Sequence, residues 1–223
     1  VHALGDDNKF AVKLYNSPDA ARKEAKIAAM VGAQLAANAP LVAFPLAIAR
    51  NEGGLFLGFV MRLVGEHKPL HDLYSPGPRK NHFPQADYRF LVRAASNLAR
   101  AVASVHQSQC VIGDINHSGI LVSPKATVAL IDADSFQFTA GSNRHLCVVG
   151  VPEYTPPELQ GKSLAGVIRT PNHDAFGLAV VIFQLLMMGR HPFVGTVRKG
   201  DIPPLEENIQ KFRYVYAENR DVG

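Results

Sequence analysis

Two neighbouring stretches decide the fold of this chain: Val111-Ile112-Gly113-Asp114-Ile115-Asn116-His117-Ser118-Gly119-Ile120-Leu121-Val122 and Ala129-Leu130-Ile131-Asp132-Ala133-Asp134. Each has an aspartate at the end of an apolar run, and the turn residues Ser123-Pro124-Lys125 stand between them. This pattern predicts a strand, a loop, a strand, a turn and a last strand. One aspartate after a strand is common, because Asp favours turn starts. Two in one hairpin predict that Asp114 and Asp132 point into one cleft.

Upstream, a lysine and a glutamate are placed on a predicted strand and a predicted helix. Residues 9–15 have the pattern of a strand that contains Lys13. Ser17-Pro18-Asp19 combines a hydroxyl N-cap, a proline at the first helical position and an acid in the first turn. These features predict a helix over residues 18–35. Beyond its first turn, this helix contains a single carboxylate, Glu24.

The other predicted elements are two strands and three helices. Residues 41–49 and 55–63 have strand patterns and are joined by the hairpin turn Asn51-Glu52-Gly53-Gly54. A long helix from residue 85 has its apolar residues on one face, whereas residues 175–188 are apolar nearly all round, as in a buried central helix. A last helix is predicted near residues 205–212.

In this order, the segments resemble the signature of protein kinases. Residues 150–158 resemble the end of an activation segment, and residues 172–178 resemble the start of the buried helix of the large lobe. The resemblance implies an α+β, bilobal, protein-kinase-like fold. Residues 1–63 would be a small antiparallel-sheet N-lobe with one helix, and residues 64–223 a mainly helical C-lobe.

The resemblance also implies a role for each site residue. Lys13, held by Glu24, would orient the α- and β-phosphates of ATP. Asp132 would bind Mg²⁺, and Asp114 would act as the catalytic base toward the acceptor hydroxyl. Asp174 would accept backbone N–H groups of the loop before Asp114, or serve as a helix N-cap. The adenine would lie between Val1 and Ala11 above and Leu121 below, beside the gatekeeper Met61 and the hinge residues Arg62, Leu63 and Val64.

Four positions depart from the kinase pattern. Gly113 stands where an arginine would meet a phosphorylated activation segment, and Asn116 replaces a lysine that neutralises the transferred phosphate. Gly119 replaces the asparagine that serves as the second metal ligand. Asp134 stands where a glycine is usual, and its carboxylate is a candidate replacement ligand for Mg²⁺.

Three functions compete. The first is an ATP-dependent serine/threonine protein kinase of a bacterial signalling or stress circuit, favoured because Lys13, Glu24, Asp114 and Asp132 are present together. The second is a pseudokinase that binds nucleotide and scaffolds or regulates a partner phosphatase. The third is a small-molecule phosphotransferase of the aminoglycoside-kinase kind, which residues 150–158 disfavour because such enzymes lack this peptide-docking element.

A finer resemblance implies partners. Residues 131–137, 149–160 and 169–177 are similar to a bacterial group of kinases. These kinases are encoded with a metal-dependent serine/threonine phosphatase and a von Willebrand A-domain protein of the tellurite-resistance TerY type. The expected partners are therefore a protein substrate and these two proteins.

Composition restricts the remaining classes. The chain has 223 residues, a hydrophobic fraction of 47% and a net charge of +4. Its charge is spread out, which disfavours nucleic-acid binding, and no apolar run is long enough for a membrane span. Two cysteines and no recognisable signal peptide predict a cytoplasmic protein. No Gly-x-Gly-x-x-Gly occurs, so the glycine-rich loop is expected upstream of residue 1, and the C-lobe is expected to be truncated.

Overall fold

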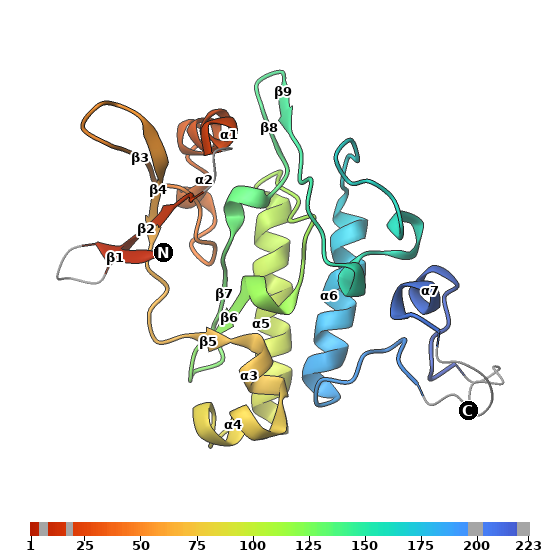
Figure 1. Cartoon of the computed structure of the whole chain (residues 1–223). Coiled ribbons are helices and arrows are strands. Elements are labelled where there is room, and N and C mark those ends of the chain that lie inside the picture. The colour runs from red at the N-terminus through yellow and green to blue at the C-terminus, as the bar shows by residue number, and fades with distance from the viewer. Residues whose placement is uncertain (5–8, 17–19, 196–202, 218–223) are drawn as a thin grey trace.

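The computed structural model describes residues 1–4, 9–16, 20–195 and 203–217. The fold is α+β, with antiparallel sheets and several helices (Figure 1). A sheet with the strand order β1-β2-β4-β3 lies at the N-terminal end, apart from the two longest helices. Its strands are β1 (His2–Leu4), β2 (Phe10–Leu14), β3 (Ala47–Arg50) and β4 (Phe56–Arg62).

The strand that carries Lys13 lies inside this sheet. β2 pairs with β1 on one side and with β4 on the other, where Ala11 is opposite Met61. Ala11 and Lys13 share a face because strand side chains alternate. β3 and β4 form the predicted hairpin, whose turn is closed by a hydrogen bond of 2.9 Å from the Gly54 N–H to the Asn51 carbonyl.

The helix predicted over residues 18–35 differs from the helices observed. α1 (Ala20–Gly32) is followed by a separate short helix, α2 (Leu35–Asn38). Between them, Gln34 has a φ of +51°, a left-handed conformation that interrupts the helix. The predicted helix start at residues 17–19 lies outside the described residues. α1 buries Ile27 and Met30 and packs against β3 and β4.

The strand predicted over residues 41–49 is only partly correct. β3 begins at Ala47, and the preceding segment pairs elsewhere: the Ala43 N–H donates to Leu130 O at 2.8 Å, and the Leu130 N–H donates to Leu41 O at 2.9 Å. Pro45, which has no N–H, separates the two pairings. Residues 41–44 therefore connect the N-terminal sheet to the middle of the chain.

The rest of the chain contains two further sheets, five α-helices and four short 3-10 helices among the described residues. A three-stranded sheet has the order β5-β6-β7, and β8 pairs with β9. The strands are β5 (Lys68–Pro69), β6 (Ile120–Val122), β7 (Val128–Leu130), β8 (Phe138–Ala140) and β9 (Asn143–His145). The α-helices are α3 (Leu70–Tyr74), α4 (Pro76–His82), α5 (Tyr88–Gln107), α6 (Pro171–Leu186) and α7 (Leu205–Gln210). The 3-10 helices are η1 (His117–Gly119), η2 (Ala133–Ser135), η3 (Pro152–Tyr154) and η4 (Pro157–Leu159).

The two long helices that the apolar periodicity of the sequence predicts are present as α5 and α6. α5 is N-capped by the Asp87 carboxylate, which accepts from the Phe90 N–H at 2.8 Å. α6 begins at a capping box formed by Thr170 and His173, four residues before the predicted start at Ala175. The two helices pack side by side (Figure 1). α5 also packs against β7 of the β6–β7 hairpin.

One continuous apolar core joins these parts. It extends from Ala11 and Met61 in the N-terminal sheet to Leu98 in α5 and Val181 in α6. Phe44, next to the Leu41–Leu130 pairing, contacts Phe136 edge-on with ring centroids 5.7 Å apart. Within the part of the chain that the structure describes, no helix is both long and apolar enough to cross a membrane.

Candidate functional site

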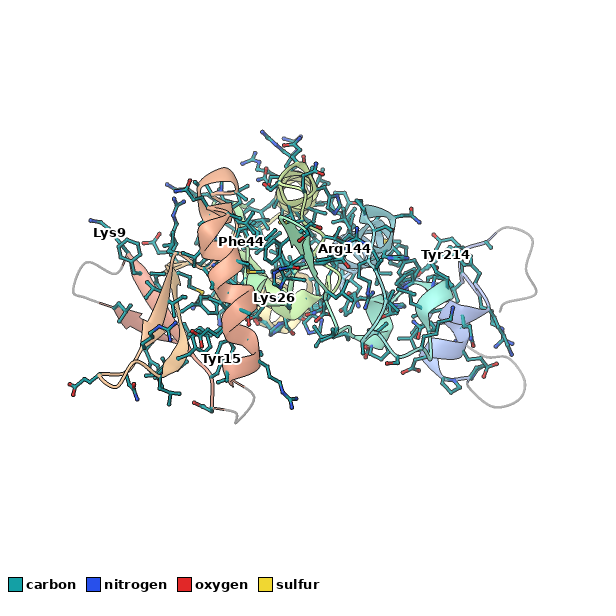
Figure 2. The ribbon with its side chains drawn as sticks, turned by 90° about the horizontal axis from the view of Figure 1, so that it is seen from above. Lys9, Tyr15, Lys26, Phe44, Arg144 and Tyr214 are labelled. Carbon is teal, nitrogen blue, oxygen red and sulfur yellow. The ribbon has the colours of Figure 1, made fainter. Side chains whose placement is uncertain are left out.

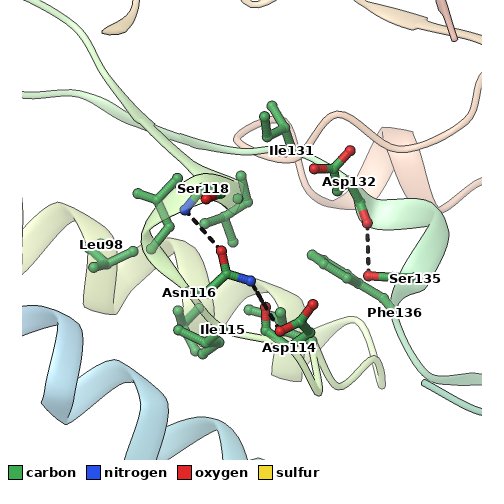
Figure 3. A pocket seen from close by; sticks show the side chains of 14 residues that line it. Leu98, Asp114, Ile115, Asn116, Ser118, Ile131, Asp132, Ser135 and Phe136 are labelled. Atoms are coloured by element: carbon green, nitrogen blue, oxygen red, sulfur yellow. Dashed lines mark hydrogen bonds between the residues drawn. The ribbon is translucent and has the colours of Figure 1, made fainter. Parts of the chain in front are cut away.

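The two aspartates of the opening stretches line one cavity of about 100 Å³ (Figure 3). β6 and β7 form the predicted hairpin. Asp114 lies on the loop before β6, and Asp132 follows β7. Gly119 lines the same cavity. The shared cleft that the sequence pattern predicts is therefore present.

A buried carboxylate of α6 holds the loop that carries Asp114. The backbone N–H groups of Ile112 and Gly113 donate to Asp174 at 2.8 and 2.7 Å. The Asp174 side chain is 1% exposed and also lies 2.8 Å from Nε2 of His106. The expectation that Asp174 accepts these N–H groups is confirmed, and His106 is a satisfied structural histidine.

The Asp114 carboxylate is held by Asn116, the residue that replaces the lysine of the usual kinase pattern. Asn116 Nδ2 donates to Asp114 Oδ1 at 3.0 Å, and Asn116 Oδ1 accepts from the Ser118 N–H at 2.9 Å (Figure 3). The Val151 N–H also donates to Asp114 Oδ1, at 3.2 Å. Asn116 therefore orients Asp114. Its short spacing from Asp114 is the only sequence signal for this contact.

Lys13 bridges two carboxylates. Its Nζ lies 2.8 Å from Asp132 Oδ1 and 2.7 Å from Asp134 Oδ1. Burial lowers the pKa of Lys13, but the charges and hydrogen bonds of the two aspartates outweigh this effect and raise it above its usual value. Lys13 is therefore a stable cation beside Asp132, which lines the cavity.

The expected ion pair of Lys13 with Glu24 is corrected by the structure. Glu24 instead pairs with Arg50, the last residue of β3. The physical reason is proximity, because α1 packs against β3 as well as β4. The ammonium group of Lys13 pairs with Asp132 and Asp134 instead of with Glu24.

Asp132 and Asp134 differ sharply in exposure. The Asp132 side chain is 57% exposed, whereas that of Asp134 is 6% exposed. Tyr15 donates to Asp134 Oδ2 at 2.7 Å. Burial alone would raise the pKa of Asp134, but the Lys13 ammonium and the hydrogen bonds from Lys13 and Tyr15 hold it below its usual value.

For Mg²⁺, the exposed Asp132 carboxylate is a fitting hard oxygen ligand. The described residues contain no group of three or more His, Cys, Asp or Glu side chains able to hold a metal ion by themselves. A cation here would therefore need further oxygens, such as those of phosphates. The role of Asp134 as second ligand stays a prediction.

The residues predicted to surround the adenine lie on three elements. Ala11 and Met61 are buried and face each other across β2 and β4. Leu121 is half-buried on β6, and Val1, before β1, is 70% exposed. β4 ends at Arg62, and the Leu63 N–H donates to Lys9 O at 2.9 Å, with Val64 following in the link to β5. Their nucleotide-binding roles stay predictions.

The segment after Asp134 is docked against the loop and α1 through backbone groups. Gly113 has a φ of +75°, and a Cβ there would lie 2.6 Å from the Cβ of Cys147, which leaves no room for a side chain. Lys26 lies on the side of α1 that faces the rest of the chain (Figure 2) and donates to Ser135 O at 2.9 Å and Leu146 O at 3.0 Å. Sequence reasoning missed this contact, since its partners are carbonyl groups.

Comparisons with known proteins identify the family of the chain. Residues 2–220 match the family model described as "Protein kinase domain". The chain is 41% identical over 223 residues to "Protein kinase YegI" of Escherichia coli O157:H7, covering 97% of this chain and 34% of that protein. It is 42% identical over 210 residues to "Protein kinase YegI" of Escherichia coli strain K12, covering 93% of this chain and 32% of that protein. The chain thus spans about a third of the length of the curated relatives it matches.

Proposed function

This chain belongs to the protein kinase domain family, and from that premise we propose that it is an ATP-dependent serine/threonine protein kinase. It would transfer the γ-phosphate of ATP to a hydroxyl of a protein substrate in a bacterial signalling or stress circuit. One observation carries the proposal: Asp114 and Asp132 line a single cavity, with the Lys13 ammonium 2.8 Å from Asp132. A cation, an exposed carboxylate and an oriented carboxylate are the groups that phosphoryl transfer needs.

Each group has a distinct proposed task. Lys13 neutralises and orients the α- and β-phosphates. Asp132 would hold Mg²⁺, which when bound would neutralise charge on the phosphate oxygens. Asp114, oriented by Asn116 and the Val151 N–H, accepts the proton of the acceptor hydroxyl.

The proposal extends to the nucleotide pocket and the domain division. Residues 1–63 would form the N-lobe and residues 64–223 the C-lobe, with the adenine between them. Its contacts would be Val1, Ala11, Met61, Arg62, Leu63, Val64 and Leu121. Support comes from the hydrogen-bonded pairing of β2 with β4, which sets Ala11 opposite Met61 at the end of the strand that leads into the link.

The finer sequence resemblance supports the proposed partners. Residues 131–137, 149–160 and 169–177 resemble kinases encoded with a metal-dependent serine/threonine phosphatase and a TerY-type von Willebrand A-domain protein. We propose these two proteins as cytoplasmic partners. Co-purification of the full-length protein with each partner, against a phosphatase from an unrelated locus as control, tests this.

A pseudokinase that regulates the phosphatase is the second candidate function. Gly119 provides no metal-ligating side chain in the cavity, and Asn116 provides no cation. A site that binds nucleotide without transferring phosphate is consistent with both substitutions. The two functions therefore differ in transfer rather than in ATP binding.

Incubation of the full-length protein with γ-labelled ATP, Mg²⁺ and the partner phosphatase separates these functions. A kinase should transfer label to itself or to the partner, and Lys13→Met and Asp132→Asn should lose both ATP affinity and transfer. Asp72→Asn, a carboxylate variant on α3, serves as the matched control. ATP binding without any transfer would refute the kinase assignment and establish the pseudokinase.

A further inference from the structure

We propose that Asp134, rather than Glu24, is the residue that positions Lys13 toward the nucleotide phosphates. The inference deepens the proposed function and rests on it for the role of Lys13. It starts from a juxtaposition in the structure: the Lys13 ammonium is 2.7 Å from the buried Asp134 carboxylate, while Glu24 is paired with Arg50.

The backbone explains why two aspartates so close in sequence have different surroundings. Asp132 has a φ of +59° and precedes η2 (Ala133–Ser135). This turn leaves the Asp132 side chain 57% exposed and that of Asp134 6% exposed. The exposed carboxylate is accessible to a metal ion, and the buried one is enclosed by side chains of β2 and α1.

Both oxygens of Asp134 have partners. Oδ1 accepts from Lys13 at 2.7 Å, and Oδ2 accepts from the Tyr15 hydroxyl at 2.7 Å. Lys23 Nζ lies 3.9 Å from Oδ2 and stands over the Tyr15 ring, 4.3 Å from its centroid. A buried carboxylate is stable only when its charge is paired and its lone pairs are used. The cluster of Lys13, Tyr15, Lys23 and Asp134 satisfies this condition.

The geometry also indicates how the two aspartates divide their work. An ammonium group has three donors, and in the structure two of them are directed at Asp132 and Asp134. If Asp132 bound a metal ion instead, Asp134 would still hold Lys13, and the other two donors of the ammonium would be available for phosphate oxygens. Without Asp134, Lys13 would have Asp132 as its remaining carboxylate partner and would compete with the metal for it.

The first test uses the nucleotide-free protein and does not depend on kinase activity. The rate at which an amine-directed acylating reagent labels Lys13 is measured by mass spectrometry from pH 7 to 10. Asp134→Asn removes one of the two carboxylates that hold the Lys13 ammonium, at 2.7 Å, so the amine should become more accessible and labelling should become faster. Glu24→Gln should change it less, and Asp72→Asn not at all. Faster labelling in Glu24→Gln than in Asp134→Asn would overturn the proposal.

The second test separates positioning from metal ligation. With Mg²⁺·ATP, Asp134→Asn should lower kcat/KM by about tenfold or more, the scale of one charged hydrogen bond, with a smaller loss for Glu24→Gln. Gly119→Asn is sterically feasible, because a Cβ there would meet only Ile131 O at 3.9 Å. If Asp134 positions Lys13, Gly119→Asn should not rescue Asp134→Asn. Rescue, together with a lowered Mg²⁺ requirement, would show that Asp134 is a metal ligand instead.

The two tests also distinguish a failed inference from a failed function. A wild-type protein that transfers no phosphate refutes the kinase assignment, while the labelling of Lys13 still reports which carboxylate it pairs with. Thermal unfolding of each variant checks that the substitution leaves the fold intact, and Asp134→Glu adds a charge-conserving variant. Partial recovery of kcat/KM in Asp134→Glu is expected. If Asp134→Asn kept its kcat/KM while Asp134→Glu lost it, a role for the negative charge would be contradicted.

Discussion

At the scale of single residues, the site is defined by which carboxylates are free and which are held. The Asp132 carboxylate is exposed and accepts from Lys13, whereas the buried Asp134 carboxylate accepts from both Lys13 and Tyr15. Asp114 is oriented through Asn116, a residue that the comparison with other kinases presented as a missing cation. Substitutions relative to a family pattern thus gain new contacts as well as losing old ones.

The proposed separation of roles, with Asp114 as the base and Lys13 and Asp132 at the phosphates and metal, leads to a prediction. Asp114→Asn keeps the shape of the side chain and removes its basicity, so ATP affinity should stay nearly unchanged. Turnover should fall by ~10²-fold or more, the scale of losing a general base. Calorimetric ATP titration and a phosphoryl-transfer assay on the same preparation measure both. Full transfer by the variant would show that Asp114 is not the base.

At the scale of elements, the segment from residue 135 to 151 is docked without a phosphate. Cys147 packs against Gly113, and Lys26 of α1 holds the carbonyl groups of Ser135 and Leu146. The Val151 N–H reaches Asp114 directly. In this structure the segment is therefore joined to both α1 and the loop that carries Asp114 by contacts that need no modification.

Activity should accordingly be independent of phosphorylation in this segment. The triple variant Ser135→Ala, Thr139→Ala, Ser142→Ala should keep basal activity within a few-fold, because a phosphate here would find Gly113 where an arginine is usual. Thr155 is buried and donates to Val151 O at 2.9 Å, so Thr155→Ala is measured separately as a structural control. The measurement is the initial rate of phosphoryl transfer. A large fall of this rate in the triple variant, with no fall in Thr155→Ala, would argue against phosphate-independent docking.

The contact of α1 with this segment also predicts a pH dependence of stability. Burial lowers the pKa of Lys26 from 10.5 to about 8. Between these values the unfolded chain binds more protons than the folded one, so stability should rise with pH through this window. From pH 7.5 to 9.5, the free energy of unfolding of the wild type should gain about 2 kcal/mol relative to Lys26→Met.

Urea unfolding at the two pH values measures this difference. Lys125→Met, which removes an exposed lysine of the β6–β7 turn, is the matched control and should show the same pH dependence as the wild type. A difference between wild type and Lys26→Met that is flat or falls with pH would show that Lys26 keeps an ordinary environment.

At the scale of the whole molecule, the N-terminal sheet is joined to the helical part by apolar packing as well as by charge. The core is continuous, and residues 41–44 pair with Leu130 of β7 while Phe44 packs edge-on against Phe136. The Lys13–Asp134 contact adds a charged link between β2 and η2. These connections predict that the two parts unfold together.

Phe44→Ala tests this coupling. Phe44 is 1% exposed, so its truncation should cost about 3–5 kcal/mol. The loss should appear as a lower midpoint of one cooperative transition, followed by both fluorescence and far-UV circular dichroism. Tyr88→Ala, at an exposed site on α5, should change stability by about 0.5 kcal/mol or less. Two separate transitions in Phe44→Ala would indicate that the parts unfold independently.

The secondary-structure elements that have local sequence signals could be predicted from the sequence without the structure. The β6–β7 hairpin with Asp114 and Asp132, the β3–β4 hairpin and the faces of α5 and α6 follow from periodicity and turn chemistry, which depend on neighbouring residues. The anchoring of the loop by Asp174 was also predicted, through the family resemblance. The tertiary structure alone decided which carboxylate holds Lys13: the sequence indicated Glu24, but the packing of α1 against β3 and the turn at Asp132 set the distances and place Asp134 there. It likewise decided that residues 41–44 pair with β7, since hydrogen bonds between distant segments leave no periodic signal in the chain.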